Sequence, residues 1–426
     1  MAIRYSEALG MIKSVAEDRI GQEDGRDIEV VPLEDAIGRT AGEDHVSPAA
    51  TPRFDASTVD GYAISSAATA NATKKWPVTF IVRGTITSGE EPRNTLPSSG
   101  GGIPSCFEIK TGARLPNGTT GHRLDACVKA EDVVTTAFGS QKMMTVVEPI
   151  PTNANKRTAG SDIRNGEVLL EKGDKIQPRH IMALASAGIT GAAVRRTLKI
   201  AMWSTAELQT TGASIYFLIA AFQELGAHVD FKGVLEGSAD AQSKAILPQI
   251  SNAAYDVVVT TGGVSKDLTM ALTTLNARIR FDSVAIEPGR SVLFATLPTC
   301  HGETPLIALP GSPVATAACF CFLVVPFVKQ LSGDRQGVPK ILKMQAKHDF
   351  RDLSVSCPVQ SDCFKHGWIQ RNTRGEEYVQ LSPDQNPAKV SHFAASDCWV
   401  HVPRGHSGSY RDTLVYCYPH TPGNFI

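Results

Sequence analysis

The stretch Asp256 to Ser265, DVVVTTGGVS, decides the fold together with a distant partner, Leu309 to Pro313, LPGSP. The first is a β-branched apolar run ending in Thr-Thr-Gly-Gly, a pattern that predicts a buried strand followed by a tight glycine loop. The second continues a strand-like run from Pro305 and precedes an alanine-rich, helix-compatible segment from Val314. Two strands that each end in a glycine turn before a helix predict a parallel α/β sheet, whose ligands bind outside the carboxyl ends of the strands.

The composition is that of a multidomain globular protein. The 426 residues predict about two to four domains, and the net charge of −1 gives no electrostatic footprint for nucleic acid or a membrane. The longest apolar run, Ala317 to Phe327, is shorter than the ~20 residues that cross a bilayer and contains Pro326, which favours a buried helix. The N-terminal residues lack the apolar core of a signal peptide. We therefore expect a cytoplasmic protein.

The nine cysteines are scattered and form no C-x-x-C pair. Cys357, Cys363 and His366 are the nearest approach to a metal site, but their spacing fits no standard zinc pattern and a fourth ligand is undefined. We therefore predict buried free thiols and assign no metal site.

Changes in residue pattern divide the chain into four predicted units. Residues 1–65 with 150–178 form an N-terminal elongated domain that opens with an amphipathic helix, and residues 66–149 form an inserted small β domain of short segments punctuated by glycine and proline. Residues 179–335 alternate strands and helices, which predicts a doubly wound α/β domain. Residues 336–426 predict a C-terminal β domain. The predicted fold class is thus α/β multidomain.

Several motifs, in order along the chain, resemble those of the molybdenum insertase family, the bacterial MoeA and gephyrin E-domain type. The family's NSAMDGYA loop appears as PRFDASTVDGYA at 52–63, and its TGA stretch as TGARLPNG at 111–118, followed by DACV at 125–128. Its GEDI element appears as GSDIRNGEVLL at 160–170. Its SSGGVS, PGKP and LPGNPV loops appear as TTGGVS, PGRS and LPGSPV. The resemblance covers nearly the whole chain.

The resemblance implies an elongated, usually dimeric protein whose active site lies between the α/β domain and the loop that holds Asp60. Members of this family bind adenylylated molybdopterin and molybdate, insert the metal and release AMP. That task needs backbone amides for the pterin phosphate, cations for the oxyanions, and carboxylates to position the chemistry and a divalent cation such as Mg²⁺.

The departures from the family pattern concentrate at the chemical positions. The family's STGDEL is here STAEL, Ser204 to Leu208, so one residue and the aspartate are missing and Glu207 is left. In the motif GGVS-x-G-x-x-D the aspartate is replaced by Met270, and Asp267 lies three residues earlier. The fold is kept, whereas the polar equipment of the insertase is largely lost.

The cleft is also predicted to be more acidic than in the family. Two lysines of the K-x-x-x-K-P-G-K-P motif are replaced by Ser283 and Glu287, which changes the local charge from +2 to −1. A unit charge about 6 Å away at an effective dielectric near 20 is worth roughly 2–3 kcal/mol. We therefore expect weaker binding of molybdate or pyrophosphate unless Lys266 and Arg290 compensate.

Polar residues nevertheless occupy the loops that the resemblance places around the cleft. Glu287 beside Arg290 is the pair expected to carry the chemistry, with Asp60 facing it as an acid or base. The candidate catalytic residues are Asp60, Glu207, Lys266, Asp267, Glu287 and Arg290. The candidate ligand-binding residues are Ser204, Thr205, Thr261, Gly262, Gly263, Ser265, Pro310, Gly311, Ser312 and Pro313.

Three functions follow from these observations. The first, favoured by the acidified cleft, is an enzyme repurposed for a small metabolite with little phosphate. The second is a molybdopterin molybdenumtransferase in which Asp267 and Glu207 replace the missing carboxylates, and only this function requires molybdopterin, molybdate and Mg²⁺. The third is a non-catalytic scaffold that binds partner proteins. We expect a homodimer with a small-molecule substrate, and no nucleic acid or membrane partner.

Overall fold

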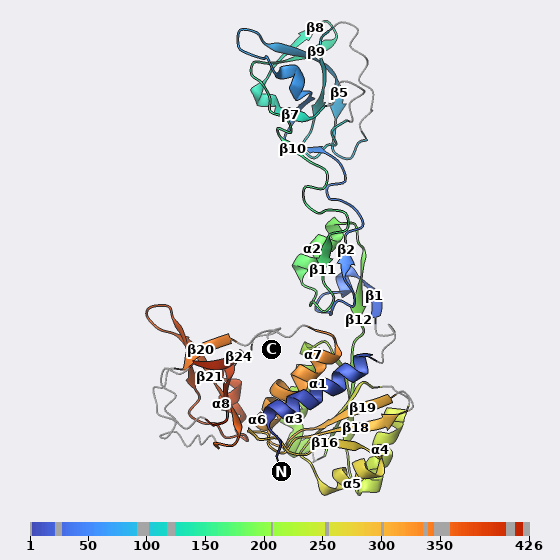
Figure 1. Ribbon diagram of the computed structural model, residues 1–426, viewed down its shortest axis with the longest axis vertical. Helices are drawn as coiled ribbons and strands as arrows, with labels where there is room; N and C mark the ends of the chain where they lie inside the picture. Colours follow the sequence, from blue (N-terminus) through green and yellow to red (C-terminus); the bar gives the residue numbers. More distant parts are fainter. Residues whose placement is uncertain are drawn as a thin grey trace.

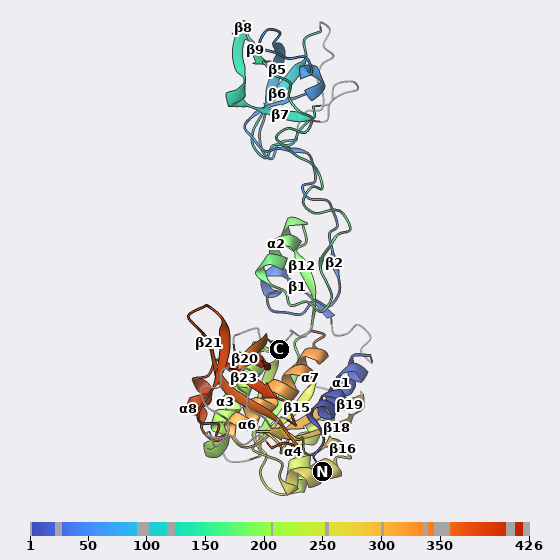
Figure 2. The same cartoon turned by 60° about the vertical axis from the view of Figure 1, so that its left-hand side comes forward.

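The computed structural model is elongated, with three bodies along its longest axis and a fourth unit beside the lowest (Figures 1 and 2). From top to bottom these are an upper β body, residues 61–146; a middle body, residues 28–46 and 163–195; an α/β unit, residues 2–21 and 199–334; and beside the last a C-terminal unit from residue 340 on. The structure describes residues 2–21, 28–91, 102–116, 124–205, 208–251, 255–299, 302–334, 340–344, 358–405 and 414–420.

The α/β unit is built on a six-stranded sheet in the order β14-β13-β15-β19-β18-β16. The first four strands are parallel to one another, and crossover connections join β13 to β14 and β14 to β15. β18 runs antiparallel to both of its neighbours, β19 and β16. The strands are β13 (Lys199–Ser204), β14 (His228–Val234), β15 (Val257–Thr261), β16 (Arg278–Phe281), β18 (Leu293–Thr299) and β19 (Gly302–Ala308). The apolar run at Val257 therefore forms the buried strand that the sequence predicts.

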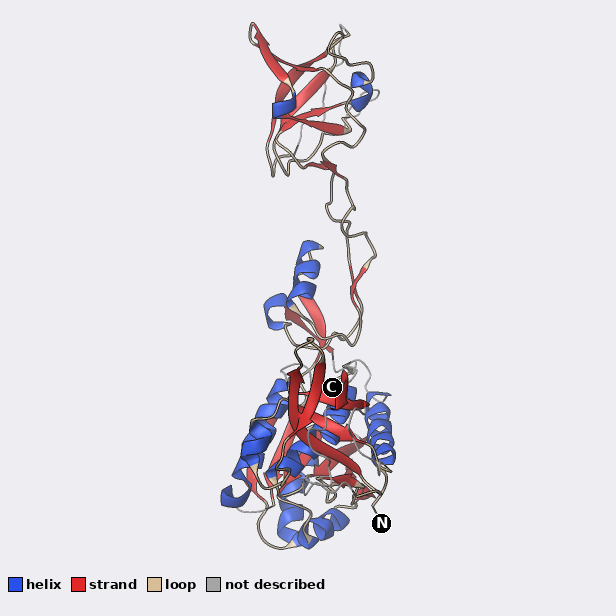
Figure 3. Cartoon of the chain, turned by 90° about the vertical axis from the view of Figure 1, so that its left-hand side faces the viewer, coloured by secondary structure: helices blue, strands red, loops and turns tan. Residues whose placement is uncertain are grey.

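Helices cover both faces of this sheet, as in a doubly wound fold (Figure 3). One face packs against α1 (Tyr5–Gly21), α3 (Leu208–Glu224), α6 (Pro313–Cys319) and α7 (Val325–Leu331), and the other against α4 (Ala239–Ser251) and α5 (Lys266–Thr274). Between α6 and α7 the helix continues as a π-helical segment, η4 (Phe320–Val324).

The continuous helix Pro313–Leu331 contains the apolar run noted in the sequence. Among the described residues it alone is long and apolar enough to cross a membrane, but 89% of its apolar window is buried inside the protein. Its phenylalanines pack into the core on one face of the sheet. The predicted buried helix is confirmed.

The upper β body is a six-stranded sheet in the order β7-β4-β6-β5-β9-β8. Its strands are β4 (Gly61–Ile64), β5 (Val78–Ile86), β6 (Ser105–Ile109), β7 (Ala126–Lys129), β8 (Val134–Phe138) and β9 (Gln141–Val146). Gly61 is required here, because a Cβ at this position would lie 1.9 Å from the Val128 carbonyl oxygen. The sheet starts earlier than the predicted boundary at residue 66, since β4 pairs with both β6 and β7.

The middle body consists of two short strand pairs and a helix. β1 (Ile28–Pro32) pairs with β12 (Gly191–Arg195), β2 (His45–Val46) pairs with β11 (Val168–Leu170), and η1 (Leu33–Asp35) and α2 (Pro178–Ser186) complete it. The body thus extends to Arg195, beyond the predicted boundary at residue 178, because Leu184 and Val194 belong to its core. Above it, β3 (Ala56–Ser57) pairs with β10 (Lys156–Arg157).

Helix α1 does not join the middle body, as the predicted domain 1–65 implied. Its apolar side chains, including Ala8 and Ile12, pack into the core of the α/β unit instead. The chain before it also contacts that unit, because the Ala285 backbone N–H donates to the Ile3 carbonyl oxygen at 2.7 Å.

The C-terminal unit is a β sheet with one short helix. It contains β20 (Lys340–Met344), β21 (Asp362–Arg371), β22 (Glu377–Leu381), α8 (Val390–Ala394), β23 (Cys398–Val402) and β24 (Leu414–Pro419). β17 (Ile286–Glu287) of the α/β unit pairs in parallel with β21, and the rings of Phe322 and Phe364 stack at 3.7 Å across the same boundary. The C-terminal unit is therefore packed firmly against the α/β unit.

The cysteines behave as predicted wherever the structure describes them. Six are free and buried, at positions 106, 127, 319, 321, 398 and 417, and Cys363 is buried as well. Cys357 lies outside the described residues, as does Cys300.

Candidate functional site

The topological switch point of the sheet lies between β13 and β15. From β13 the chain crosses to β14 on one side and then returns to β15 on the other, so the carboxyl ends of these two strands form the edge at which α/β sheets bind their ligands. Thr205 follows β13, and its backbone N–H donates to the Thr261 carbonyl oxygen at 2.7 Å. Its hydroxyl donates to the Gly263 carbonyl oxygen at 3.1 Å. Ser204 is buried beside it.

The two glycine loops, 261–265 and 309–313, meet at this edge of the sheet. The Gly263 N–H donates to the Leu309 carbonyl oxygen at 3.0 Å, and the Thr261 hydroxyl donates to the Pro310 carbonyl oxygen at 3.4 Å. A Cβ on Gly311 would lie 3.1 Å from the Gly262 carbonyl oxygen. Gly262 and Gly263 have φ values of 112° and 104°, which favour glycine. Two loops about 50 residues apart thus form one backbone surface, to which only glycine is suited.

The segment Glu287 to Arg290 lies at the same edge of the sheet. β18 is antiparallel to β19 and Leu293 pairs with Ala308, so the residues before β18 lie beside the carboxyl end of β19. Glu287 is half-buried in β17, whereas Arg290 is exposed. No ion pair joins these two side chains among the described residues. Both lie at the edge of the sheet where the glycine loops meet, and their expected part in the chemistry stays a prediction.

Helix α5 begins at this edge, directly after the first glycine loop. The Ser265 hydroxyl accepts a hydrogen bond from the Leu268 N–H at 3.0 Å and so caps the helix. Ser265 is therefore occupied by a structural role. Lys266 and Asp267 in the first turn are exposed, and within the described part of the chain neither takes part in an ion pair. Met270, which stands where the family motif has an aspartate, is also exposed. This position therefore supplies no carboxylate to the site.

The C-terminal unit supplies a wall of the site that the sequence did not reveal. Ser312 and Pro313 open α6, and the Val314 N–H donates to the Pro387 carbonyl oxygen at 3.1 Å. Pro387 lies in the loop between β22 and α8, where Asp384 and Lys389 form an ion pair of 2.6 Å. The turn-forming residues SPDQNPAK at 382–389 predict a loop, but the sequence of a loop does not indicate which part of the protein it will contact.

Asp60 is held rigidly, but at the other end of the molecule. One carboxylate oxygen accepts from the Thr111 N–H at 2.8 Å and from its hydroxyl at 2.9 Å, and Lys110 lies 3.4 Å from the other. The two Thr111 hydrogen bonds, aided by Lys110, lower the pKa of Asp60 below its usual value. Asp60 precedes β4 in the upper β body, which the middle body separates from the α/β unit (Figure 1).

The predicted cleft between Asp60 and the α/β unit is therefore not formed within one chain. The three bodies are stacked end to end, so the Asp60 loop and the glycine loops lie in different bodies (Figure 2). Glu207, the other candidate carboxylate, lies outside the described residues. Among the described side chains, no three histidines, cysteines, aspartates or glutamates are grouped so that they could hold a metal ion.

Family models and known relatives match this chain over nearly its full length. Residues 3–188 match the family model described as the MoeA N-terminal region (domain I and II), and residues 203–330 match that of a probable molybdopterin binding domain. A molybdopterin molybdenumtransferase of Synechococcus elongatus is 31% identical over 422 residues, which cover 95% of this chain and 96% of that protein. The chain belongs to the MoeA-type molybdenum insertase family.

Two further relatives agree with this membership in the MoeA-type family. The molybdopterin molybdenumtransferase of Haemophilus influenzae is 28% identical over 386 residues, covering 87% of this chain and 89% of that protein. The crystal structure of the molybdopterin biosynthesis MoeA protein from Pyrococcus horikosii matches with a TM-score of 0.76, 26% identity and 98% coverage of both chains. The predicted family and α/β multidomain fold are confirmed.

Proposed function

We propose that this chain is a molybdopterin molybdenumtransferase, which inserts molybdenum from molybdate into adenylylated molybdopterin. The observation that carries the proposal is the meeting of two glycine loops at the carboxyl ends of β15 and β19, the edge at which parallel α/β sheets bind their ligands. The relatives that match the chain over nearly its full length are named for that activity. They favour it over the repurposed enzyme that the altered cleft suggests.

The side chains at this edge add little net charge. Lys266 and Arg290 are cations, Asp267 and Glu287 are carboxylates, and the four sum to zero. An anion at this edge would therefore rely on Lys266, Arg290 and those backbone N–H groups of the loops that are not already bonded within the protein. The described residues do not fit a Mg²⁺ site, because they contain no cluster of three carboxylate or imidazole ligands.

We further propose that the site is completed by a second copy of the chain. Asp60 is oriented by Thr111 and ionised, but it cannot reach the glycine loops of its own chain. In a symmetric dimer, the upper β body of one chain can lie against the α/β unit of the other. Asp60 of one chain would then face the cleft of its partner as an acid or base.

Intersubunit complementation tests this arrangement. In a homodimer of either variant, Asp60→Ala or Gly311→Ala, both sites have one damaged half. In a mixed dimer of the two variants, one site carries both changes and the other site carries neither. Random mixing of the two variants should therefore restore about a quarter of the wild-type activity. No recovery on mixing, from two folded and dimeric variants, would show that each chain builds its site alone.

Calorimetric titration of the purified protein with AMP, molybdate and adenylylated molybdopterin tests the function itself. Binding of all three, weakened in Gly311→Ala and unchanged in Gly10→Ala, supports the molybdenumtransferase. Gly10 is a matched control because an added Cβ in α1 meets nothing within 4 Å. A folded dimer that binds none of these ligands would contradict the proposal.

The second candidate is an enzyme repurposed for a neutral or cationic metabolite. It is favoured by the carboxylates of Asp267 and Glu287 beside the glycine loops and by the absence of lysine at Ser283 and Glu287. Binding of such a metabolite without molybdate would identify it, and stoichiometric capture of a protein partner would favour a scaffold instead. The free, buried cysteines suit a reducing compartment, and for this reason we propose a cytoplasmic location.

A further inference from the structure

Charged side chains are gathered where the middle body meets the α/β unit. Asp334 follows α7, and its side chain is only 6% exposed. Lys175 of the middle body lies across the junction, with its Nζ 3.9 Å from an Asp334 carboxylate oxygen. Lys329 of α7 is also buried, and the Asp334 N–H donates to its carbonyl oxygen at 2.9 Å. Asp334 thus pairs with a cation of the middle body and is bonded through its backbone to Lys329 of α7, whose charge also acts on its carboxylate.

Burial perturbs all three groups. Burial lowers the pKa of Lys175 and of Lys329. Burial raises the pKa of Asp334, and the charges of these two lysines partly offset this by lowering the pKa of Asp334. Without the Asp334 charge, the two ammonium groups would face each other in a poorly solvated place, and this repulsion would push the bodies apart.

Hydrogen bonds within the middle body hold Lys175 and Arg195 in place at this junction, and Arg195 also meets the turn after α7. The Lys175 Nζ also donates to the Gly38 carbonyl oxygen at 3.3 Å, and Arg39 donates to the Arg195 carbonyl oxygen at 2.7 Å. A Cβ on Gly333, at the end of α7, would lie 3.4 Å from Nε of Arg195. The guanidinium at the base of the middle body is therefore packed against the turn that carries Asp334.

We propose that Lys175, Asp334 and Lys329 form a latch that fixes the direction of the middle body on the α/β unit. The chain joins these two bodies only between α1 and β1 and between β12 and β13, so non-covalent contacts must set the angle. The upper β body is carried at the far end of the middle body (Figure 1). A small rotation at the latch therefore produces a large displacement of the upper β body. This role goes beyond the proposed reaction and does not depend on it.

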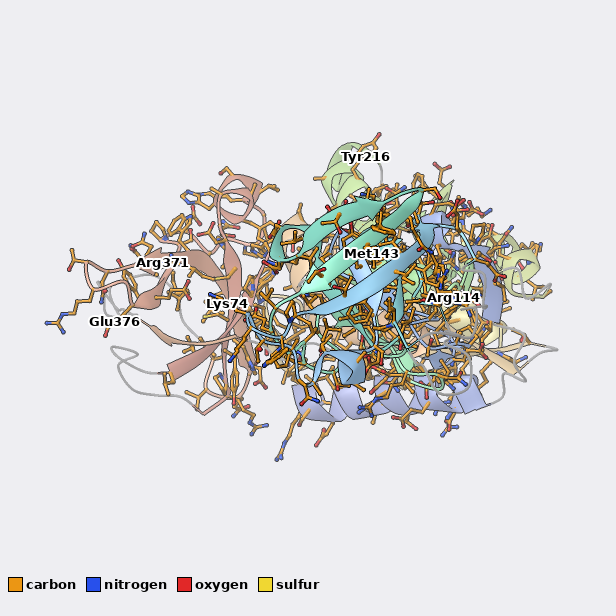
Figure 4. The ribbon with its side chains drawn as sticks, turned by 90° about the horizontal axis from the view of Figure 1, so that it is seen from above. Lys74, Arg114, Met143, Tyr216, Arg371 and Glu376 are labelled. Carbon is orange, nitrogen blue, oxygen red and sulfur yellow. The ribbon has the colours of Figure 1, made fainter. Side chains whose placement is uncertain are left out.

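Single-molecule energy transfer measures the angle directly. Donor and acceptor dyes are attached through non-natural amino acids at Met182 on α2 and Tyr216 on α3, both exposed. Tyr216 projects from the outside of α3 in the view along the long axis (Figure 4). Labelled full-length chains are mixed with excess unlabelled chains, so that only pairs within one chain contribute. The wild type is expected to give one narrow distribution.

Asp334→Asn should broaden that distribution or add a second population, and Lys175→Met should do the same. The backbone amide hydrogens in the last turn of α7 should exchange with solvent about tenfold faster in both variants than in the wild type. The control is Asp240→Asn, which breaks an exposed ion pair with Lys244 inside α4 and should change nothing. Lys175→Met lies in the middle body and serves if Asp334→Asn fails to fold. A folded variant of either kind with the wild-type distribution and exchange would overturn the latch.

Discussion

Acid should destabilise the C-terminal unit through His366. This residue lies in β21, is 1% exposed, and has no hydrogen-bond partner for either ring nitrogen within the described part of the chain. Its ring meets those of Phe393 and Trp399 edge-on, with centroids 5.9 and 6.2 Å apart. Burial, assisted by the nearby His420, lowers the pKa of His366 from 6.5 to about 4.

The sign and size of the effect follow from proton linkage. Between pH 6.5 and 4 the unfolded chain binds a proton at this histidine and the folded chain does not, so stability falls as the pH falls. At about 1.4 kcal/mol per pKa unit, lowering the pH from 7.5 to 5.0 should reduce the free energy of unfolding by about 2 kcal/mol through His366. Burial also lowers the pKa of His420 to about 4, so the wild-type loss should be larger than this share.

Fluorine NMR of 5-fluorotryptophan protein reports on the right unit. The chain has four tryptophans, and Trp399 lies beside His366 in β23 of the C-terminal unit, where that unit packs on the α/β unit. Urea titrations that follow the Trp399 resonance at pH 7.5 and pH 5.0 give the two free energies of unfolding. At pH 5.0 most carboxylates are ionised in both states, so the histidines dominate the difference.

His366→Leu separates this explanation from a general effect of acid. Leucine fills a similar volume and removes two unpaired polar atoms, so stability at pH 7.5 should change little while about 2 kcal/mol of the acid loss disappears. His228→Gln, in an exposed position on β14, is the control and should keep the full loss. Equal wild-type stability at the two pH values, or an undiminished loss in His366→Leu, would refute the reasoning.

Three substitutions test the glycine loops and the packing of the α/β unit. In Gly311→Ala the new Cβ would lie 3.1 Å from the Gly262 carbonyl oxygen, so we expect at least about tenfold weaker AMP binding by calorimetry with the fold retained. In Gly289→Ala the Cβ would lie 2.4 Å from the Cys319 sulfur at a φ of +117°, and urea unfolding should show a loss of roughly 2–4 kcal/mol. Asp256→Asn weakens a buried carboxylate that binds two guanidinium groups and a backbone N–H, and should lose about 3 kcal/mol in the same assay. Wild-type values would contradict each expectation.

Local pattern determined much of the α/β unit. The β-branched run before Thr261 and the glycines after it specify a buried strand and a tight loop, because both depend on the backbone preferences of consecutive residues. The apolar helix Pro313–Leu331 is likewise buried as its composition predicts. The meeting of the two glycine loops also follows from sequence, since parallel strands bring their carboxyl ends to one edge.

Tertiary structure alone decided where the bodies and the charged residues lie. β1 pairs with β12 across more than 150 residues, and no feature near either strand signals that choice. Asp60 and Glu287 lie in different bodies. The sequence does not predict this separation, because the order of the motifs does not encode the direction of the connecting strands. The contacts of Pro387 with α6 and of Asp334 with Lys175 are also long-range. Sequence fixes the conformation of a segment, whereas its partner depends on packing among segments that are distant along the chain.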